Sequence, residues 1–403
     1  MRILNVTQSY APFFEFGGPP VKVRALAEGF AARGHVVTVL TADWGLDRRL
    51  QQFPNEAPAE HNTFGRERKI AGVTAIYLGN WLHYRTASWN PALPRFLRAR
   101  LQEFEVAHIF GLYDMLGPRV AAACREKKIP YVVEPIGMFV PRVRNLWLKR
   151  MYHRFPGREM LVGASAIVAT AEQEKAELIA GGIPKEKIVL RRNGVEGPPA
   201  LPERGRFREA MGIPPEAKLL LFLGRLSEKK SPHLLLQAFA KIAASEIRGQ
   251  VPVHLAFVGP DEASMLAKLK KMAASIVPAG RVHFSPALAD TAKWQAYRDA
   301  DIFVLPSQNE NFGNTAAEAI AAGTPVIVTD QCGIAPLLTG VAGLVVKHDE
   351  IALTNGIQEL LHDGRLYAGL HAGCATVRGA LSWHQPIEQM INVYAALAAH
   401  SDS

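Results

Sequence analysis

The sequence predicts an α/β protein built from two doubly wound, Rossmann-like domains. Short apolar runs alternate with longer amphipathic stretches from one end of the chain to the other, which is the pattern of βα units around a parallel sheet. The 403 residues are enough for two domains of ordinary size. A segment rich in glycine and proline at residues 197–202 interrupts the alternation near the middle of the chain, and we predict a linker there.

The first domain begins with a complete βαβ unit. A strand over residues 3–6 leads through a Gly17-Gly18 loop to a helix over residues 20–33, and a second strand covers residues 36–40. Further strands are predicted at residues 74–78, 106–110, 131–134, 166–169 and 188–191. Helices are predicted between them near residues 92–103, 117–127, 145–154 and 171–181.

The alternation restarts after the linker and ends in one more amphipathic helix over residues 385–398. The predicted strands of this half lie at residues 219–223, 253–258, 281–284, 302–305, 325–328 and 344–346. We therefore place the domains at residues 1–195 and 196–380, with a final segment at 381–403. Ligands of open parallel sheets bind beyond the carboxyl ends of the strands, so we expect the domains to face a central cleft.

The charge of the chain is concentrated in its first half. Residues 1–195 carry 28 basic and 17 acidic side chains, a net of +11, whereas residues 196–403 carry 18 and 20, a net of −2. A basic half suits an anionic partner such as a phospholipid surface or a phosphorylated substrate, although solvated surface charge explains it equally well. No nucleic-acid-binding motif accompanies the charge, so we expect no nucleic-acid partner.

Cysteine usage and hydrophobicity indicate the compartment. Cys124, Cys332 and Cys374 are far apart and lack CxxC spacing, which favours a reducing compartment without disulfides or a zinc cluster. The sequence shows neither a signal peptide nor a membrane-spanning apolar run. We expect a cytoplasmic protein, with any contact to the inner face of the cell membrane being peripheral.

The most informative segment covers residues 305–325, where a buried strand runs into a polar loop and then a helix. Backbone N–H groups at Phe312, Gly313 and Asn314 would lie at the positive end of that helix, which suits a diphosphate or sugar hydroxyls. Glu310 and Glu318 suit the paired hydroxyls of a hexose and a ribose. Taken alone, Glu318 is better explained as complementing the helix dipole and Glu310 as a solvated loop acid, but the whole string favours a binding site.

Two other loops follow first strands. After the first strand of the second domain, Gly224 allows close approach to the backbone, and Arg225 and Lys230 place two cations where a pyrophosphate can bind. In the first domain Gly17-Gly18 is weaker evidence, because an ordinary turn explains it. The chain has no GxGxxG and no GxxxxGK[ST] string, which disfavours dinucleotide dehydrogenases and nucleoside-triphosphate hydrolases.

Together these segments resemble glycosyltransferase family 4, the retaining sugar transferases with the GT-B fold. The resemblance extends over essentially the whole chain, through the Gly-Gly loop, Arg33-Gly34-His35, Asn193-Gly194-Val195, the Gly-Arg-Leu-x-x-x-Lys loop at 224–230, Glu310-x7-Glu318 and the string at 323–327. It implies that the C-terminal helix crosses back to the first domain.

The resemblance also implies roles for single residues. Gly17 and Gly18 would approach the donor diphosphate, and Arg225 and Lys230 would neutralise it. The other implied donor contacts are Glu310, Asn311, Phe312, Gly313 and Asn314, with Glu318 on the ribose. Among these we expect Glu310, Arg225 and Lys230 to act in catalysis without a metal or cofactor, because fixed cations and N–H dipoles stabilise charge on a leaving phosphate.

The chain departs from the family at a His-x-His string that many members carry at the end of the fourth strand. Here the string reads His108-Ile109-Phe110, so Phe110 stands where the second histidine is expected. We expect His108 to point to the face opposite Phe110 and to be structural. Ser231 also replaces the glycine that often follows the lysine of the 224–230 loop.

Two acidic positions are open to more than one interpretation. Glu134 follows a buried strand and is expected to emerge at the cleft as a base or as a residue that orients the acceptor, although pairing with Arg142 or Arg144 explains it equally well. Asp299-Ala300-Asp301 matches the metal-binding DxD string of other sugar transferases, but it precedes an apolar strand. We interpret it as a helix end and a strand start, and predict no metal site.

Residues 141–158 form a basic stretch without an acidic residue, interleaved with aromatic and aliphatic side chains. It suits an anionic membrane or a lipid-linked diphosphate, whereas a solvated helix with a buried apolar face is the plainer explanation. The candidate acceptor or membrane patch consists of Arg142, Arg144, Lys149 and Arg150.

The expected function is retaining, metal-independent transfer of a hexose from a nucleotide-diphosphate sugar to a glycan or lipid-linked saccharide in envelope or exopolysaccharide biosynthesis. A sugar-nucleotide epimerase or phosphorylase on the same scaffold is an alternative. A non-catalytic two-lobed sugar-binding protein is another. The sequence does not distinguish UDP, GDP and ADP donors.

Overall fold

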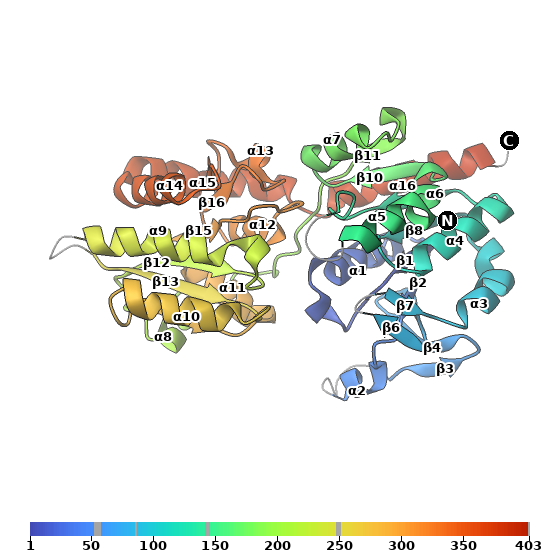
Figure 1. The fold of residues 1–403 in the computed structure, drawn as a ribbon, viewed down its shortest axis with the longest axis horizontal. Coiled ribbons are helices and arrows are strands. Elements are labelled where there is room, and N and C mark those ends of the chain that lie inside the picture. Colours follow the sequence, from blue (N-terminus) through green and yellow to red (C-terminus); the bar gives the residue numbers. More distant parts are fainter. Residues whose placement is uncertain (52–57, 85–86, 142–145, 247–250, 402–403) are drawn as a thin grey trace. The chain divides into compact units, whose positions relative to one another are not determined.

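The computed structural model describes residues 1–51, 58–84, 87–141, 146–246 and 251–401. The chain forms two compact units (Figure 1). Unit 1 comprises Met1–Asn193 and Trp383–Ser403, and unit 2 comprises Gly194–Ser382. None of the described helices is long and apolar enough to cross a membrane.

Within the described part of unit 1, nine strands form one sheet in the order β11-β10-β9-β8-β1-β2-β5-β4-β3. The predicted parallel strands are present as β1 (Arg2–Thr7), β2 (Val36–Ala42), β5 (Val73–Leu78), β8 (Val106–Phe110), β9 (Tyr131–Glu134), β10 (Ala166–Ala169) and β11 (Ile188–Leu190). The antiparallel edge formed by β3 (Glu60–Asn62) and β4 (Gly65–Ile70) was not predicted, and neither was the hairpin of β6 (Leu82–Tyr84) and β7 (Ala87–Trp89).

Helices cover both faces of this sheet and bury two apolar clusters against it. They are α1 (Gly18–Ala31), α3 (Leu93–Arg100), α4 (Leu116–Lys127), α5 (Leu146–Arg154), α6 (Pro156–Val162), α7 (Glu172–Ala180) and α16 (His384–Ser401), with a short α2 (Leu46–Leu50) near the edge. The last helix, α16, packs on α1 and buries Ile387, Met390 and Tyr394 in the unit 1 core. The C-terminal helix therefore returns to the first unit, as expected.

Unit 2 has a parallel sheet in the order β14-β13-β12-β15-β16-β17 across its described residues. Its strands are β12 (Lys218–Leu223), β13 (Val253–Val258), β14 (Val282–Ser285), β15 (Ile302–Leu305), β16 (Val326–Thr329) and β17 (Gly343–Val346). Its helices are α8 (Arg206–Met211), α9 (Pro232–Ser245), α10 (Met265–Ile276), α11 (Asp290–Asp299), α12 (Asn314–Ala321), α13 (Ala335–Leu338), α14 (Glu350–His362) and α15 (Gly364–Ala380). All six predicted strands of this half are present.

A buried ionic network lies inside unit 1. Glu134, at the end of β9, accepts from Lys22 Nζ at 2.6 Å and from Arg191 Nη2 at 2.5 Å, and all three side chains are buried. The Arg191 guanidinium also lies over the Trp383 ring, 5.8 Å from its centroid. One carboxylate thus joins α1, β9, the segment after β11 and the segment that precedes α16.

This network corrects the expectation for Glu134. Its side chain is fully buried and does not emerge at a surface, because two cations hold it beneath the sheet edge. Its cationic partners are distant in sequence; the expected partners Arg142 and Arg144 lie outside the described residues. Burial would raise the pKa of Glu134, but the charges of Arg191 and Lys22 outweigh it and lower this pKa to about 2.

His108 belongs to the same buried region. Its Nδ1 is 2.5 Å from Tyr394 Oη, and burial lowers its pKa to about 3, so the ring is neutral and structural as expected. The predicted orientation was wrong, because the rings of His108 and Phe110 stack on one face of β8 with centroids 3.9 Å apart. Residues two apart in a strand share a face, and α16 covers this one.

Glu134→Gln is expected to destabilise unit 1 by about 3–5 kcal/mol, because it leaves two buried cations without a counter-charge. Hydrogen exchange of the β8 and β9 amides measures this loss, with β12 and β13 of unit 2 as an internal reference. Glu159→Gln is the matched control, since its pair with Arg125 is exposed and its loss should cost at most about 1 kcal/mol.

The same carboxylate gives unit 1 an acid-dependent stability with a definite sign. A folded pKa near 2 lies below the ordinary value of 4.5, so the stabilisation is complete above pH 4.5 and is lost as the pH falls toward 2. Glu134→Gln should lack this part of the acid loss. A variant with wild-type protection at neutral pH and an unchanged acid profile would contradict the network.

Gly373→Ala is expected to destabilise unit 2 by about 1–3 kcal/mol. Helix α15 passes so close to the loop before β17 that a Cβ at Gly373 would lie 1.7 Å from the carbonyl oxygen of Val341. Gly369→Ala in the same helix meets nothing within 4 Å and should be neutral or stabilise by about 0.5–1 kcal/mol. Amide protection in unit 2 separates the two outcomes, and equal effects would exclude the close approach as the cause.

Candidate active site

Two loops of unit 2 meet at the carboxyl ends of β12 and β15, which are parallel neighbours in the sheet. The backbone N–H of Gln308 donates to the carbonyl of Lys229 at 3.1 Å, and its side-chain amide donates to the carbonyl of Glu228 at 3.0 Å. The loop after β16 supports the same region, because Glu310 N–H donates to Gln331 O and Gly333 N–H donates to Glu310 O. The segments singled out in the sequence therefore form one surface of unit 2.

Lys230 and Glu310 form an ion pair at the centre of this surface. The Lys230 ammonium lies 2.8 Å from Glu310 Oε2, and each side chain is 20% exposed. Burial would raise the pKa of Glu310, but the charge of Lys230 outweighs it and lowers this pKa. The Glu310 carboxylate is thus ionised at neutral pH, and both side chains are accessible to a ligand.

Glycines let the backbone and Lys230 pack tightly here. A Cβ at Gly224 would lie 3.4 Å from Lys230 Cδ, so the lysine stem lies against this glycine. Gly259, at the end of β13, approaches even closer, since its Cβ would be 2.0 Å from the carbonyl oxygen of Gly224. Next to Gly224, the exposed Arg225 pairs with Glu262 at 3.5 Å, which leaves its guanidinium within reach of solvent and of an anion.

Helix α12 begins at the same surface. Its N-cap is Gly313, whose φ of 107° is in the left-handed region that favours glycine, and no side chain caps the helix. Phe312 is buried in the unit 2 core and anchors the loop, so the first N–H groups of the helix are held in place beside it. The Thr315 hydroxyl in this first turn is buried without a hydrogen-bond partner among the described residues.

Glu318 is positioned by residues that the sequence analysis did not identify. Lys293 Nζ lies 2.9 Å from Glu318 Oε1, and Tyr297 Oη donates to Glu318 Oε2 at 2.8 Å. Lys293 and Tyr297 are four residues apart on α11, so they lie on one helix face. The spacing of four residues shows that Lys293 and Tyr297 share a face of α11, but nothing in the sequence indicates that this face packs against α12.

Ser231 closes the 224–230 loop in an unusual conformation. Its φ of 47° is left-handed, which explains why a glycine suits this position in the family. Its hydroxyl oxygen lies 2.9 Å from Nε2 of His348, a residue of the segment between β17 and α14. After Lys293 and Tyr297, His348 is a third positioning residue that the sequence did not reveal.

In unit 1, Gly17 and Gly18 lie at the start of α1, after β1. Gly17 is the N-cap with a φ of 95°, and the helix continues with Pro19 and Pro20. Because proline has no backbone N–H, the Gly18 N–H is the main donor left at this helix start. These glycines, Glu134 and the basic patch at residues 142–150 belong to unit 1, whereas the other expected catalytic and donor-binding residues belong to unit 2.

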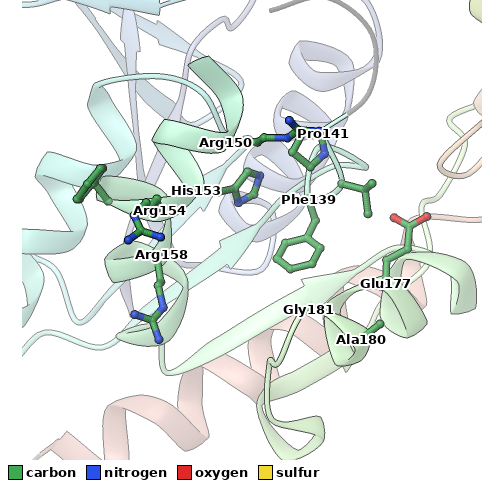
Figure 2. A pocket seen from close by; sticks show the side chains of 11 residues that line it. Phe139, Pro141, Arg150, His153, Arg154, Arg158, Glu177, Ala180 and Gly181 are labelled. Carbon is green, nitrogen blue, oxygen red and sulfur yellow. The ribbon is translucent and has the colours of Figure 1, made fainter. Parts of the chain in front are cut away.

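The basic stretch of unit 1 borders a pocket of about 940 Å³ (Figure 2). Arg150 lines it, together with Arg154 and Arg158. Lys149 instead lies over the Tyr113 ring, 5.3 Å from its centroid. Of the four residues expected in the patch, Arg150 lines the pocket and Lys149 lies against Tyr113, while Arg142 and Arg144 fall outside the described residues.

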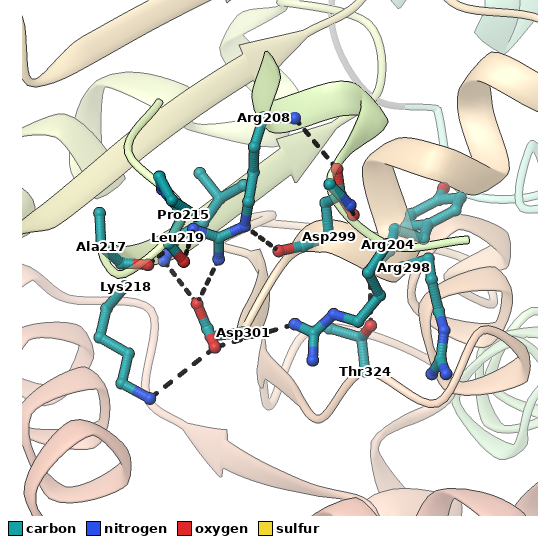
Figure 3. A network of polar contacts seen from close by, with 12 residues as sticks. Arg204, Arg208, Pro215, Ala217, Lys218, Leu219, Arg298, Asp299, Asp301 and Thr324 are labelled. Carbon is teal, nitrogen blue, oxygen red and sulfur yellow. Dashed lines mark hydrogen bonds and ion pairs between the residues drawn. The ribbon is translucent and has the colours of Figure 1, made fainter. Parts of the chain in front are cut away.

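Asp299 and Asp301 belong to a structural network at the opposite edge of the unit 2 sheet (Figure 3). Asp301 pairs with Arg208 at 2.8 Å, and Asp299 accepts from the backbone N–H groups of Phe207 and Arg208 at the start of α8. Asp299 ends α11 and β15 begins at Ile302, as predicted. These carboxylates tie α8 to the sheet.

Known families match both halves of the chain. The model for glycosyl transferases group 1 matches residues 203–372, and the model for a glycosyl transferase 4-like domain matches residues 17–194. D-inositol 3-phosphate glycosyltransferase from Streptomyces bingchenggensis is 32% identical over 251 residues, which are 60% of this chain and 55% of that protein. The enzyme of that name from Geodermatophilus obscurus is 32% identical over 256 residues, 61% and 56%. The matches thus span little more than half the length of these relatives.

Solved structures match nearly the whole fold. Sucrose-phosphate synthase from Thermosynechococcus elongatus has a TM-score of 0.74 at 21% identity, and the match covers 99% of both chains. Anabaena HepE in complex with UDP and glucose has a TM-score of 0.73 at 18% identity, covering 98% of this chain and 100% of that one. Both domains therefore have the GT-B arrangement of strands and helices, and with the two family matches this shows that the chain belongs to the group 1 glycosyltransferases of family 4.

Proposed function

We propose that this glycosyltransferase is a metal-independent, retaining enzyme that moves a hexose from a nucleotide-diphosphate sugar to a glycan or lipid-linked saccharide in envelope or exopolysaccharide biosynthesis. The observation that carries the proposal is the Lys230–Glu310 pair, 2.8 Å apart, beside Gly224 and Arg225 in unit 2. It combines a cation for a phosphate and a carboxylate for sugar hydroxyls in one partly exposed contact.

The pair has a defined task when a donor binds. A diphosphate offers Lys230 a stronger partner than one carboxylate, and Arg225 adds a second cation. Glu310 then has oxygens free to accept hydrogen bonds from hydroxyls of the hexose, while Glu318 binds the ribose. Each ligand group replaces a contact that the protein already makes, so both charged side chains stay partnered.

Catalysis follows from the same charges. As the glycosidic bond to the phosphate breaks, negative charge grows on the leaving diphosphate, and Lys230, Arg225 and the first N–H groups of α12 stabilise it. The hexose becomes cation-like, and the leaving phosphate helps to deprotonate the acceptor hydroxyl on the same face, which retains the configuration.

Relatives support the donor and acceptor classes. The HepE structures contain UDP with glucose, or UDP-glucose, and WaaG, a neighbour with a TM-score of 0.70 at 18% identity, is a glycosyltransferase involved in lipopolysaccharide biosynthesis. The curated relatives are named for a phosphorylated acceptor. These names are consistent with a nucleotide-sugar donor and an anionic or lipid-linked acceptor. They are also consistent with a peripheral contact to an anionic membrane through the basic patch of Arg142, Arg144, Lys149 and Arg150.

Lys230→Ala and Glu310→Ala are each expected to lower kcat by about 10²–10³-fold, the usual cost of removing one group that stabilises the transition state. They should differ in binding. Lys230→Ala should weaken the binding of both the free nucleoside diphosphate and the nucleotide sugar, whereas Glu310→Ala should weaken the binding of the nucleotide sugar only. Thermal shift with UDP, GDP, ADP and their hexose conjugates identifies the donor and then measures both variants.

Lys241→Ala is the matched control. This lysine lies on the exposed face of α9 and pairs with Glu350 at the start of α14, so its replacement should leave both kcat and nucleotide binding unchanged. Wild-type transfer rates in Lys230→Ala and Glu310→Ala would refute the site. Turnover of the donor without any acceptor would favour an epimerase, and stoichiometric binding without turnover would favour a sugar-binding protein.

A further inference from the structure

The pocket of unit 1 in Figure 2 lies between three chain segments. The segment after β9 contributes Phe139, Val140 and Pro141, helices α5 and α6 contribute one side, and the end of α7 contributes Glu177, Ala180 and Gly181. Phe139 lies between the arginine-bearing helices and α7, and it packs so tightly that a Cβ at Gly181 would be 2.2 Å from its ring. The pocket thus has an apolar floor where the Phe139 ring packs against Gly181.

The wall formed by α5 and α6 is cationic. Arg150, Arg154 and Arg158 follow at intervals of four residues and all line the cavity. In the part of the chain that the structure describes, no carboxylate forms an ion pair with any of them, and Glu177 is the one acidic residue of the lining. Three cations around one cavity repel each other, so an anion that enters it is stabilised.

His153 does not add to this charge. Its Nε2 is 2.8 Å from the Tyr113 hydroxyl, and burial lowers its pKa, which leaves the imidazole neutral at pH 7. The charged side chains of the pocket lining are therefore the three arginines and Glu177.

An exposed apolar stripe runs beside the arginines. Trp147, Met151 and Phe155 also follow at intervals of four residues and are 62%, 51% and 59% exposed. These side chains lie next to the arginines along α5 and its junction with α6. Large apolar side chains beside arginines on a helical surface are typical of a surface that lies in the headgroup region of a membrane. Exposure of these three apolar side chains to water does not stabilise the folded protein, so their arrangement indicates an interaction surface.

We propose that the pocket binds the phosphate group of an anionic membrane lipid, while Trp147, Met151 and Phe155 enter the interface beside it. The inference rests on the membrane contact proposed above and deepens it, because it assigns the phosphate to Arg154 and Arg158 as well as Arg150 and gives it a cavity with an apolar floor. A phosphate with an attached acyl or prenyl chain matches this pairing of cations and apolar surface.

Vesicle co-sedimentation of the full chain tests the pocket. The wild type is expected to bind vesicles of phosphatidylcholine mixed with phosphatidylglycerol and to bind phosphatidylcholine alone weakly, with an affinity that falls as salt is raised. Arg154→Gln with Arg158→Gln should weaken binding roughly 30-fold, at about fivefold per arginine. Arg98→Gln, which removes an exposed charge on α3 of the same unit, should change it less than about twofold.

A soluble probe separates a lipid from a free phosphorylated ligand. Glycerol 3-phosphate should protect the wild type and Trp147→Ala equally in a thermal-shift assay, whereas Trp147→Ala should lose vesicle binding. If Trp147→Ala binds vesicles as well as the wild type does, the pocket serves a soluble ligand and the lipid proposal is wrong. Equal weakening by Arg98→Gln and by the pocket variant would show diffuse surface charge and overturn the pocket.

Nucleotide-induced stabilisation reports on unit 2, so the folding check for each variant of unit 1 is the amide protection of β8 and β9. Should the double variant lose it, Arg150→Gln alone, on the exposed helix surface, carries the test. Because the donor site and this pocket involve different residues, loss of vesicle binding with intact nucleotide stabilisation concerns the pocket alone. Absence of nucleotide binding with intact vesicle binding would instead refute the donor site.

Discussion

The burial of Glu134 between Lys22 and Arg191 is the constraint on which unit 1 depends. A charge inside a protein is tolerated only when it is paired and hydrogen-bonded, so Lys22 and Arg191 each require Glu134. Lys22 brings α1 to the end of β9, and Arg191 brings the chain that leaves β11 to the Trp383 ring at the entry of α16. The helix start with Gly17-Gly18 and both segments that connect the units are therefore fixed by one carboxylate.

Unit 2 has ion pairs at both ends of its parallel strands, and these pairs differ in their exposure to solvent. At the amino-terminal edge, Asp301 and Arg208 are nearly buried and are hydrogen-bonded on several sides, so they hold α8 to the sheet. At the carboxyl edge, Lys230 and Glu310 are each 20% exposed, and backbone bonds between loops already hold them in place. A ligand that exchanged partners with the second pair would leave the fold intact, as the proposed donor site requires.

The sequence predicted the parallel strands well because each is a short apolar run, a signal that does not depend on tertiary contacts. The β3–β4 edge escaped because its segments, Glu60–Asn62 and Gly65–Ile70, are almost entirely polar, as an edge exposed to solvent permits. The partners of Glu134 were not predicted, for another reason. Neighbouring arginines were expected, but the order of strands in the sheet decides which distant residues meet, and Lys22 and Arg191 come from elements far from β9 in the sequence.

The excess positive charge of the first half can be assigned to a part of the surface only when cations in ion pairs are distinguished from cations outside them. Several arginines of unit 1, among them Arg2, Arg33 and Arg125, have carboxylate partners and contribute little to the field at a distance. Salt screens exposed charges beyond about 8 Å, so a partner senses a local cluster rather than the sum over a domain. Arg150, Arg154 and Arg158 form such a cluster around one cavity, whereas the donor diphosphate needs two cations and a helix start in a nearly neutral unit 2. In the proposed function, the excess of +11 in residues 1–195 therefore bears on the basic patch of unit 1 and not on the donor diphosphate.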